Sequence, residues 1–156
     1  MHPMEQLLNE QDHKTKTAWA LDCAEHVISY FNDLFPEDSR PNDAIAAGRS
    51  WIGDASTVLD AQKASVAAHN AARDVVETEF SQTDYQKPLS EGEGMQGAAC
   101  AAARAAGQAV AAAHAAGHAQ HAATYALKAV SFAEGADAVS KEREWQYQKL
   151  AELAQK

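Results

Sequence analysis

The sequence has only two cysteines, Cys23 and Cys100, and they stand far apart in a chain of 156 residues. Small secreted domains that depend on disulfides carry many closely spaced cysteines, so a disulfide framework is excluded and a reducing compartment is expected. Neither cysteine adjoins a glycine-rich turn or another signature of a nucleophilic thiol. We therefore interpret both as small core residues.

Long apolar runs are missing as well, because no stretch of 18 consecutive apolar residues occurs. The first twelve residues are polar and lack the basic start and apolar stretch of a signal peptide. These two absences predict a cytoplasmic protein that neither enters a membrane nor is exported.

Basic residues are scarce, with 13 Lys and Arg against 22 Asp and Glu, which gives a formal net charge of −9. Binding to nucleic acid relies on clustered Lys and Arg that displace counterions from the phosphates, so we exclude nucleic acid as a partner. A basic protein is the favoured partner instead. The competing interpretation is that the acidity serves solubility alone.

Catalytic motifs are absent too. The sequence has no glycine-rich phosphate loop, no Gly-x-Ser-x-Gly turn and no His-Glu-x-x-His pair. We therefore expect a protein that is not an enzyme and that needs no cofactor.

Alanine at helical spacing is what the sequence has in abundance. The length is near the commonest size of one domain, and it allows a core that needs no metal or disulfide. We predict an all-α fold, a single compact bundle of about five to seven alanine-rich helices over residues 13–156. Residues 1–12 are expected to form a polar tail or a short helix.

The first half of the chain predicts three amphipathic helices, over residues 17–35, 41–52 and 57–79. Proline marks the boundary between the first two, since Pro36 cannot continue a helix and Pro41 suits a first turn. Thr57 and Asp60 have the spacing of a capping box at the start of the third helix.

The second half begins with a predicted loop over residues 79–94, which are rich in Ser, Thr, Asp, Pro and Gly and have no period. Alanine then accounts for 17 of the 29 residues from 98 to 126. Alanine has the highest helix propensity, and Gly117 is the natural place for a turn that makes this tract a helical hairpin. A last helix is expected over about residues 138–154.

Three histidines, His114, His118 and His121, recur at the spacing of one face of an unbroken helix. Imidazole is a common ligand of zinc, copper and nickel. However, no carboxylate or thiol lies in the segment, and a turn at Gly117 would separate His114 from His121. We interpret the trio as structural and keep a metal site as the weaker alternative.

Other polar side chains stand among alanines, namely His69, Arg73 and Arg104. A buried polar group needs a partner, and Asp22 and Glu25 are candidates for that role. Acidic residues are concentrated further along, where residues 74–93 hold a single basic residue, Lys87. A mobile acidic segment would steer a basic partner toward the protein, so we predict partner contacts at Asp74, Glu77, Glu79, Asp84, Glu91 and Glu93.

Several segments, in this order, resemble the fifth, alanine-rich family of immunity proteins of polymorphic toxin systems. They are WALDCAEHV (residues 19–27), Arg40-Pro41 with Ala44-Ile45 and Trp51, AAHNAAR (67–73), AAGQAV (105–110) with His114 and His118, YALKA (125–129) and EREWQ (142–146). The chain departs from the family pattern in its acidic stretch, residues 74–94, and at residues 50–54.

The resemblance implies an all-helical cytoplasmic protein that binds and neutralises a cognate toxin and has no enzymatic activity. The alternative function is that of a metal-binding helical bundle, with or without enzymatic activity. Stoichiometric metal in untagged protein would favour the bundle, whereas a toxin gene beside this one would favour the immunity protein.

Overall fold

The computed structural model describes residues 3–79 and 91–155. All regular secondary structure in this part of the chain is helical, and no strand is present there, which confirms the all-α prediction. The helices are α1 (Pro3–Asn9), α2 (His13–Val27), α3 (Ser29–Leu34), α4 (Arg40–Ile52), α5 (Val58–Glu79), α6 (Glu91–Ala111), α7 (His118–Glu134) and α8 (Ala136–Ala154). Among these described segments, none is both long and apolar enough to span a membrane.

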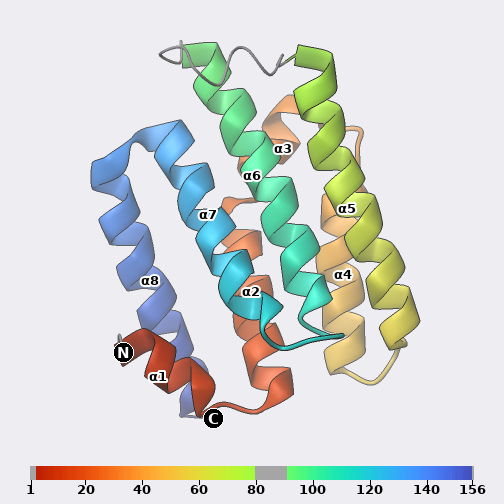
Figure 1. The fold of residues 1–156 in the computed structure, drawn as a ribbon, viewed down its shortest axis with the longest axis vertical. Helices are drawn as coiled ribbons and strands as arrows, with labels where there is room; N and C mark the ends of the chain where they lie inside the picture. The colour runs from red at the N-terminus through yellow and green to blue at the C-terminus, as the bar shows by residue number, and fades with distance from the viewer. Residues whose placement is uncertain (1–2, 80–90, 156) are drawn as a thin grey trace.

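The alanine-rich helix α6 is the centre of the bundle. It lies between α5 and α7, with α2, α3 and α4 behind it in Figure 1, and it contacts all five. A helix surrounded in this way must be apolar on most of its circumference, and its alanines let the neighbouring axes approach closely. The fully buried alanines of α6 accordingly point in many directions: Ala98, Ala99, Ala102, Ala103, Ala105, Ala106 and Ala109.

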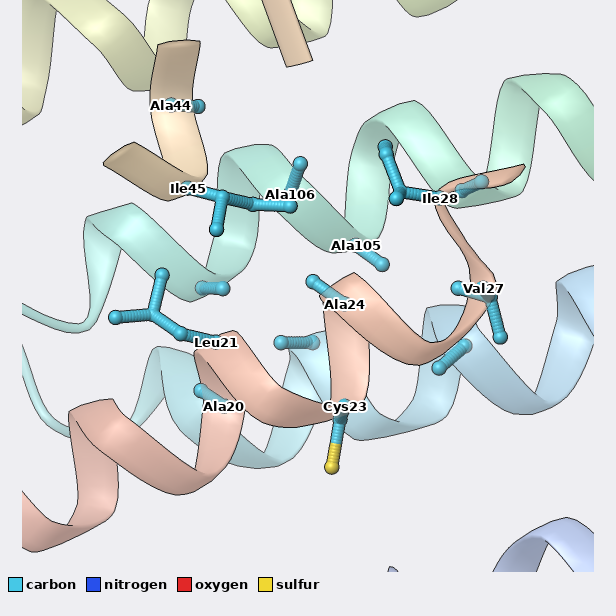
Figure 2. Close-up of a cluster of buried hydrophobic side chains, with 14 of the residues drawn as sticks. Ala20, Leu21, Cys23, Ala24, Val27, Ile28, Ala44, Ile45, Ala105 and Ala106 are labelled. Carbon is cyan, nitrogen blue, oxygen red and sulfur yellow. The ribbon is translucent and has the colours of Figure 1, made fainter. Parts of the chain in front are cut away.

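A few large side chains supplement this core of small residues. Trp19, Phe31 and Leu150 are fully buried, and the indole N–H of Trp19 donates to the backbone oxygen of Gln146 at 2.8 Å. Figure 2 shows Ala24 of α2 on the side that faces Ala105 of α6, whereas neighbouring side chains of α2 point elsewhere. Because an alanine side chain is a single methyl group, the large side chains contribute apolar burial that the alanines cannot supply.

The predicted helix over residues 17–35 is wrong in one respect, because the structure divides it into α2 and α3. The break falls at Ile28, whose N–H bonds to the oxygen of Glu25, three residues back, at 3.4 Å. A turn tightened in this way interrupts the helix without changing the apolar spacing. The sequence pattern consequently gave no sign of it.

The start of α5 is as predicted, since Thr57 and Asp60 form a reciprocal capping box. The Asp60 N–H donates to Thr57 Oγ1 at 3.1 Å, and the Thr57 N–H donates to Asp60 Oδ2 at 3.2 Å. The turn at Gly117 is also confirmed, because α6 ends at Ala111 and Gly117 precedes the first residue of α7.

The predicted loop over residues 79–94 is shorter than expected at its far end. Residues 91–94 belong to α6, where the high helix propensity of the alanine tract extends the helix toward the N-terminus. Residues 80–90 lie outside the described part of the chain.

Candidate functional site

A polar stripe interrupts the alanines of α6 at every fourth residue. Its members are Gln96, Cys100, Arg104 and Gln108, and each is partly exposed, whereas most other residues of the helix from residue 98 onward are buried. Residues four apart share one face of a helix. The stripe lies where α5 and α7 flank α6, and we call the depression along it the α6 groove. Two hollows occur in this groove, one toward each end of α6.

The histidine end of the α6 groove is a hollow of about 450 Å³ near the α6–α7 turn. Its lining residues come from α5, α6, the turn and α7: Gln62, Ser65, Val66, His69, Gln108, Ala111, His114 and His118. Amides hold two of the imidazoles in place. Gln62 Nε2 lies 3.1 Å from His114 Nδ1, and Gln108 Oε1 lies 2.7 Å from His118 Nδ1. The hollow therefore presents imidazoles and amides beside an apolar surface.

Two of these histidines are held away from the charged form. Burial is the main cause that lowers the pKa of His69, and the positive charge of Arg104 lowers it further. Burial also lowers the pKa of His118, with His121 and His114 as smaller causes. Both imidazoles are therefore neutral at pH 7.

The histidine trio of the sequence analysis does not share one helix face. His114 lies in the turn before α7, while His118 and His121 are on α7 with ring centroids 5.8 Å apart. In the described residues, no three His, Cys, Asp or Glu side chains are grouped so that they could hold a metal ion. The groove joins His114 and His118 with His69 instead, a combination that the sequence spacing did not indicate.

The cationic end of the α6 groove is a hollow of about 400 Å³. The hollow is lined by Val75 and Val76 of α5, by Gln96, Gly97, Cys100, Ala101 and Arg104 of α6, and by Tyr125, Lys128, Ser131 and Phe132 of α7. Cys100 is thus a lining residue that is only partly buried, and it packs against the edge of the core, not within it as predicted. Cys23 is buried in the core as predicted, and burial raises its thiol pKa well above the usual value.

A second surface forms where α8 packs against α2, and we call it the α2–α8 surface. The rings of His26 and Trp145 stack there with centroids 3.6 Å apart and planes inclined by 8°. His26 Nδ1 lies 2.6 Å from a carboxylate oxygen of Glu142, a side chain that is only 10% exposed. A shallow hollow of about 260 Å³ beside the stack is bordered by Asp22, Glu25, His26, Trp145 and Lys149.

The chain matches the family described as Imm-5 like putative immunity protein over residues 6–85 and 92–153. It belongs to this family. No curated protein and no solved structure matches it.

Membership of the Imm-5 like family confirms the resemblance, and the structure shows where the segments that carried it meet. Residues 19–27 and 142–146 form the α2–α8 surface through the His26–Trp145 stack and the Trp19–Gln146 hydrogen bond. Residues 67–73, 105–110 and 125–129 contribute to the α6 groove. Separate segments of the family pattern thus converge on two surfaces.

The acidic residues predicted to contact a partner are only partly described. Asp74 is exposed on α5, and its carboxylate pairs with Arg40 at 2.8 Å. Glu77 and Glu79 lie on the last turns of α5 and Glu91 and Glu93 on the first turn of α6, with their side chains outside the description. Asp84 lies outside the described residues.

The partners suggested for the polar residues among the alanines are wrong. Asp22 and Glu25 both bind Arg49, at 2.7 and 3.0 Å, rather than His69, Arg73 or Arg104. Arg49 lies in the last turn of α4, and α4 packs against α2. Its neighbours in the sequence, Ser50 and Trp51, gave no indication of this ion pair.

The α6 groove itself was missed, although its signal is present in the sequence. Gln96, Cys100, Arg104 and Gln108 recur at a strict four-residue spacing within an otherwise alanine-rich tract. That spacing predicts one helix face left open by its neighbours.

Proposed function

We propose that this chain is an immunity protein that binds a cognate toxin in the cytoplasm and blocks it without catalysing a reaction. The observation that carries the proposal is the match to the Imm-5 like family over nearly the whole chain. A neutralising protein needs a stable surface complementary to its toxin and no catalytic machinery. The bundle supports such a surface on packed helices.

We propose the α2–α8 surface as the place where the toxin binds. Trp145 is partly exposed, and its stacking on His26 fixes the ring before any partner arrives. A large aromatic side chain that is already immobilised loses little entropy on binding, which is why tryptophan is common among the residues that dominate binding energy. The carboxylate of Glu142 holds the imidazole at its edge, through Nδ1.

The acidic character of the chain supports a basic toxin domain as the partner. The net charge is −9, and the exposed Glu25, which pairs with Arg49, borders the hollow beside the stack together with Asp22. Acidic residues at 74–93 would act at longer range by raising the rate of encounter. In this proposal the stack supplies contact energy and the acidic stretch supplies steering.

The proposal is tested by producing this chain together with the toxin domain encoded beside its own gene. Wild-type protein should restore growth of cells that make the toxin. The double variant His26→Ala, Trp145→Ala should protect poorly, whereas Tyr147→Ala, which removes an exposed aromatic on the same helix, should protect fully. Equal cell death with and without the wild-type chain would contradict the immunity function. Full protection by the double variant would contradict the surface.

A further inference from the structure

We propose that the cationic end of the α6 groove binds an organic anion with an apolar body, of the class of aliphatic or aryl carboxylates. This inference is independent of toxin binding, because the hollow lies between α5, α6 and α7 and shares no residue with the α2–α8 surface.

The first argument is the apolar wall of the hollow. Val75 and Val76 line one side, Ala101 and Cys100 the floor, and Phe132 the other side. The volume of about 400 Å³ lies in the range of small-molecule sites, which is about 300–1,000 Å³. An apolar wall of this size favours a ligand that brings apolar surface of its own.

The shape of the hollow depends on a glycine. A Cβ atom at Gly97 would lie 2.6 Å from Cδ1 of the Phe132 ring, so only glycine lets that ring rest against α6. Phe132 is nevertheless 36% exposed, because its outer face borders the hollow. An exposed ring held on a glycine is a preformed apolar contact for a ligand.

The second argument is the charge at the hollow, where Arg104 and Lys128 are both lining residues. Among the side chains that the structure describes, neither forms an ion pair. Arg40 and Arg49, by contrast, each hold two carboxylates. Two cations that border one apolar hollow and hold no carboxylate leave that hollow positively charged.

The two cations border the hollow from two neighbouring helices, α6 and α7. Arg104 belongs to the polar stripe of α6, and Lys128 lies on α7 with its Nζ 4.9 Å from the centroid of the Tyr125 ring. A carboxylate between them would gain two charge-assisted interactions, while its hydrocarbon part covers the valines and Phe132. An inorganic anion would leave the apolar wall exposed to water, and a cation would be repelled.

The test uses the full-length protein and isothermal titration with decanoate and, separately, 3-phenylpropionate, each below the concentration at which it aggregates. Decanol is the uncharged control for decanoate. We expect one site per chain and an affinity for decanoate at least about tenfold higher than for decanol. Comparison of the two acids shows whether the aliphatic or the aryl member of the class is preferred.

Variants locate the site. Arg104→Gln and Lys128→Gln should each weaken decanoate binding by about tenfold. Lys141→Gln, which removes an exposed cation on α8, should leave it unchanged. NMR signals of the Tyr125 and Phe132 rings should shift on titration, and circular dichroism should show that every variant keeps its helices. Equal binding of decanol and decanoate, wild-type affinity in both charge variants, or no binding of either acid would each overturn the proposal.

Discussion

Replacement of Gly107 by alanine should have opposite effects on stability in the presence and in the absence of one side chain, that of His69. A Cβ atom added at Gly107 would lie 2.7 Å from His69 Nε2 and 2.9 Å from Cδ2. These contacts are too short, so the imidazole ring or one of the two helices must move. Ser65 restrains α5 in this region, because its hydroxyl donates to the Gly107 oxygen at 2.9 Å.

The magnitude follows from two opposing contributions. Alanine is favoured over glycine in a helix interior by about 1 kcal/mol. Overpacking of a tight contact costs about 1–3 kcal/mol. Gly107→Ala should therefore lower the free energy of unfolding by roughly 0–2 kcal/mol in the wild type. In the His69→Ala background the clash is gone, and the same substitution should raise it by about 1 kcal/mol.

Urea denaturation followed by circular dichroism measures all four proteins of this double-mutant cycle. Gly117→Ala is the matched control, because a Cβ there meets nothing within 4 Å and the backbone φ of −59° suits alanine. That control should be neutral or slightly stabilising. If Gly107→Ala stabilises the wild type as much as the His69→Ala background, the close approach of α5 and α6 at this point is wrong.

Three further predictions concern packing, pH and encounter. Ala122→Leu and Ala112→Leu should each lower the free energy of unfolding by about 1–3 kcal/mol, because both alanines are fully buried; an unchanged denaturation midpoint in both would contradict the packing. The free energy of unfolding should fall as the pH drops below about 6.5, because burial lowers the pKa of His69 and His118 and the unfolded chain then binds protons more readily. Above that pH the two imidazoles are neutral in both states, and the free energy of unfolding keeps its full value. His69→Gln removes one of the two groups, so its free energy of unfolding should fall less on acidification than that of the wild type; an equal fall in the variant would refute this prediction. Neutralising Glu77, Glu79 and Glu91 together should slow association with the toxin, and so should salt above about 0.15 M. A stopped-flow association rate of the triple variant equal to that of the wild type would refute electrostatic steering.

Local rules were sufficient to predict most helices from the sequence. The capping box at Thr57 and the turn at Gly117 rest on hydrogen bonds and helix propensity within a few residues, and both are where the sequence predicted them. The break at Ile28 was not predictable, because it replaces one backbone hydrogen bond by a shorter-range one and leaves the side-chain pattern intact.

Contacts between distant helices could not be read from the sequence. The His26–Trp145 stack joins residues on the second and the last helix, and the Arg49–Asp22 ion pair joins α4 to α2. Helix spacing identifies which face of each helix is buried, but it does not say which faces meet. The polar stripe of α6 is the exception, since four polar residues at a four-residue spacing mark an open face on one helix alone.

We propose that this member of the Imm-5 like family neutralises a toxin by binding it through the α2–α8 surface. The most direct test is the dissociation constant of the complex with the toxin domain encoded beside its gene, measured for the wild type, Trp145→Ala and Tyr147→Ala. Loss of a central aromatic contact typically costs about 2 kcal/mol or more, so Trp145→Ala should weaken binding by about 30-fold. Tyr147→Ala should stay within about threefold of the wild type, which corresponds to less than about 1 kcal/mol. An affinity of Trp145→Ala equal to that of the wild type would contradict the claim.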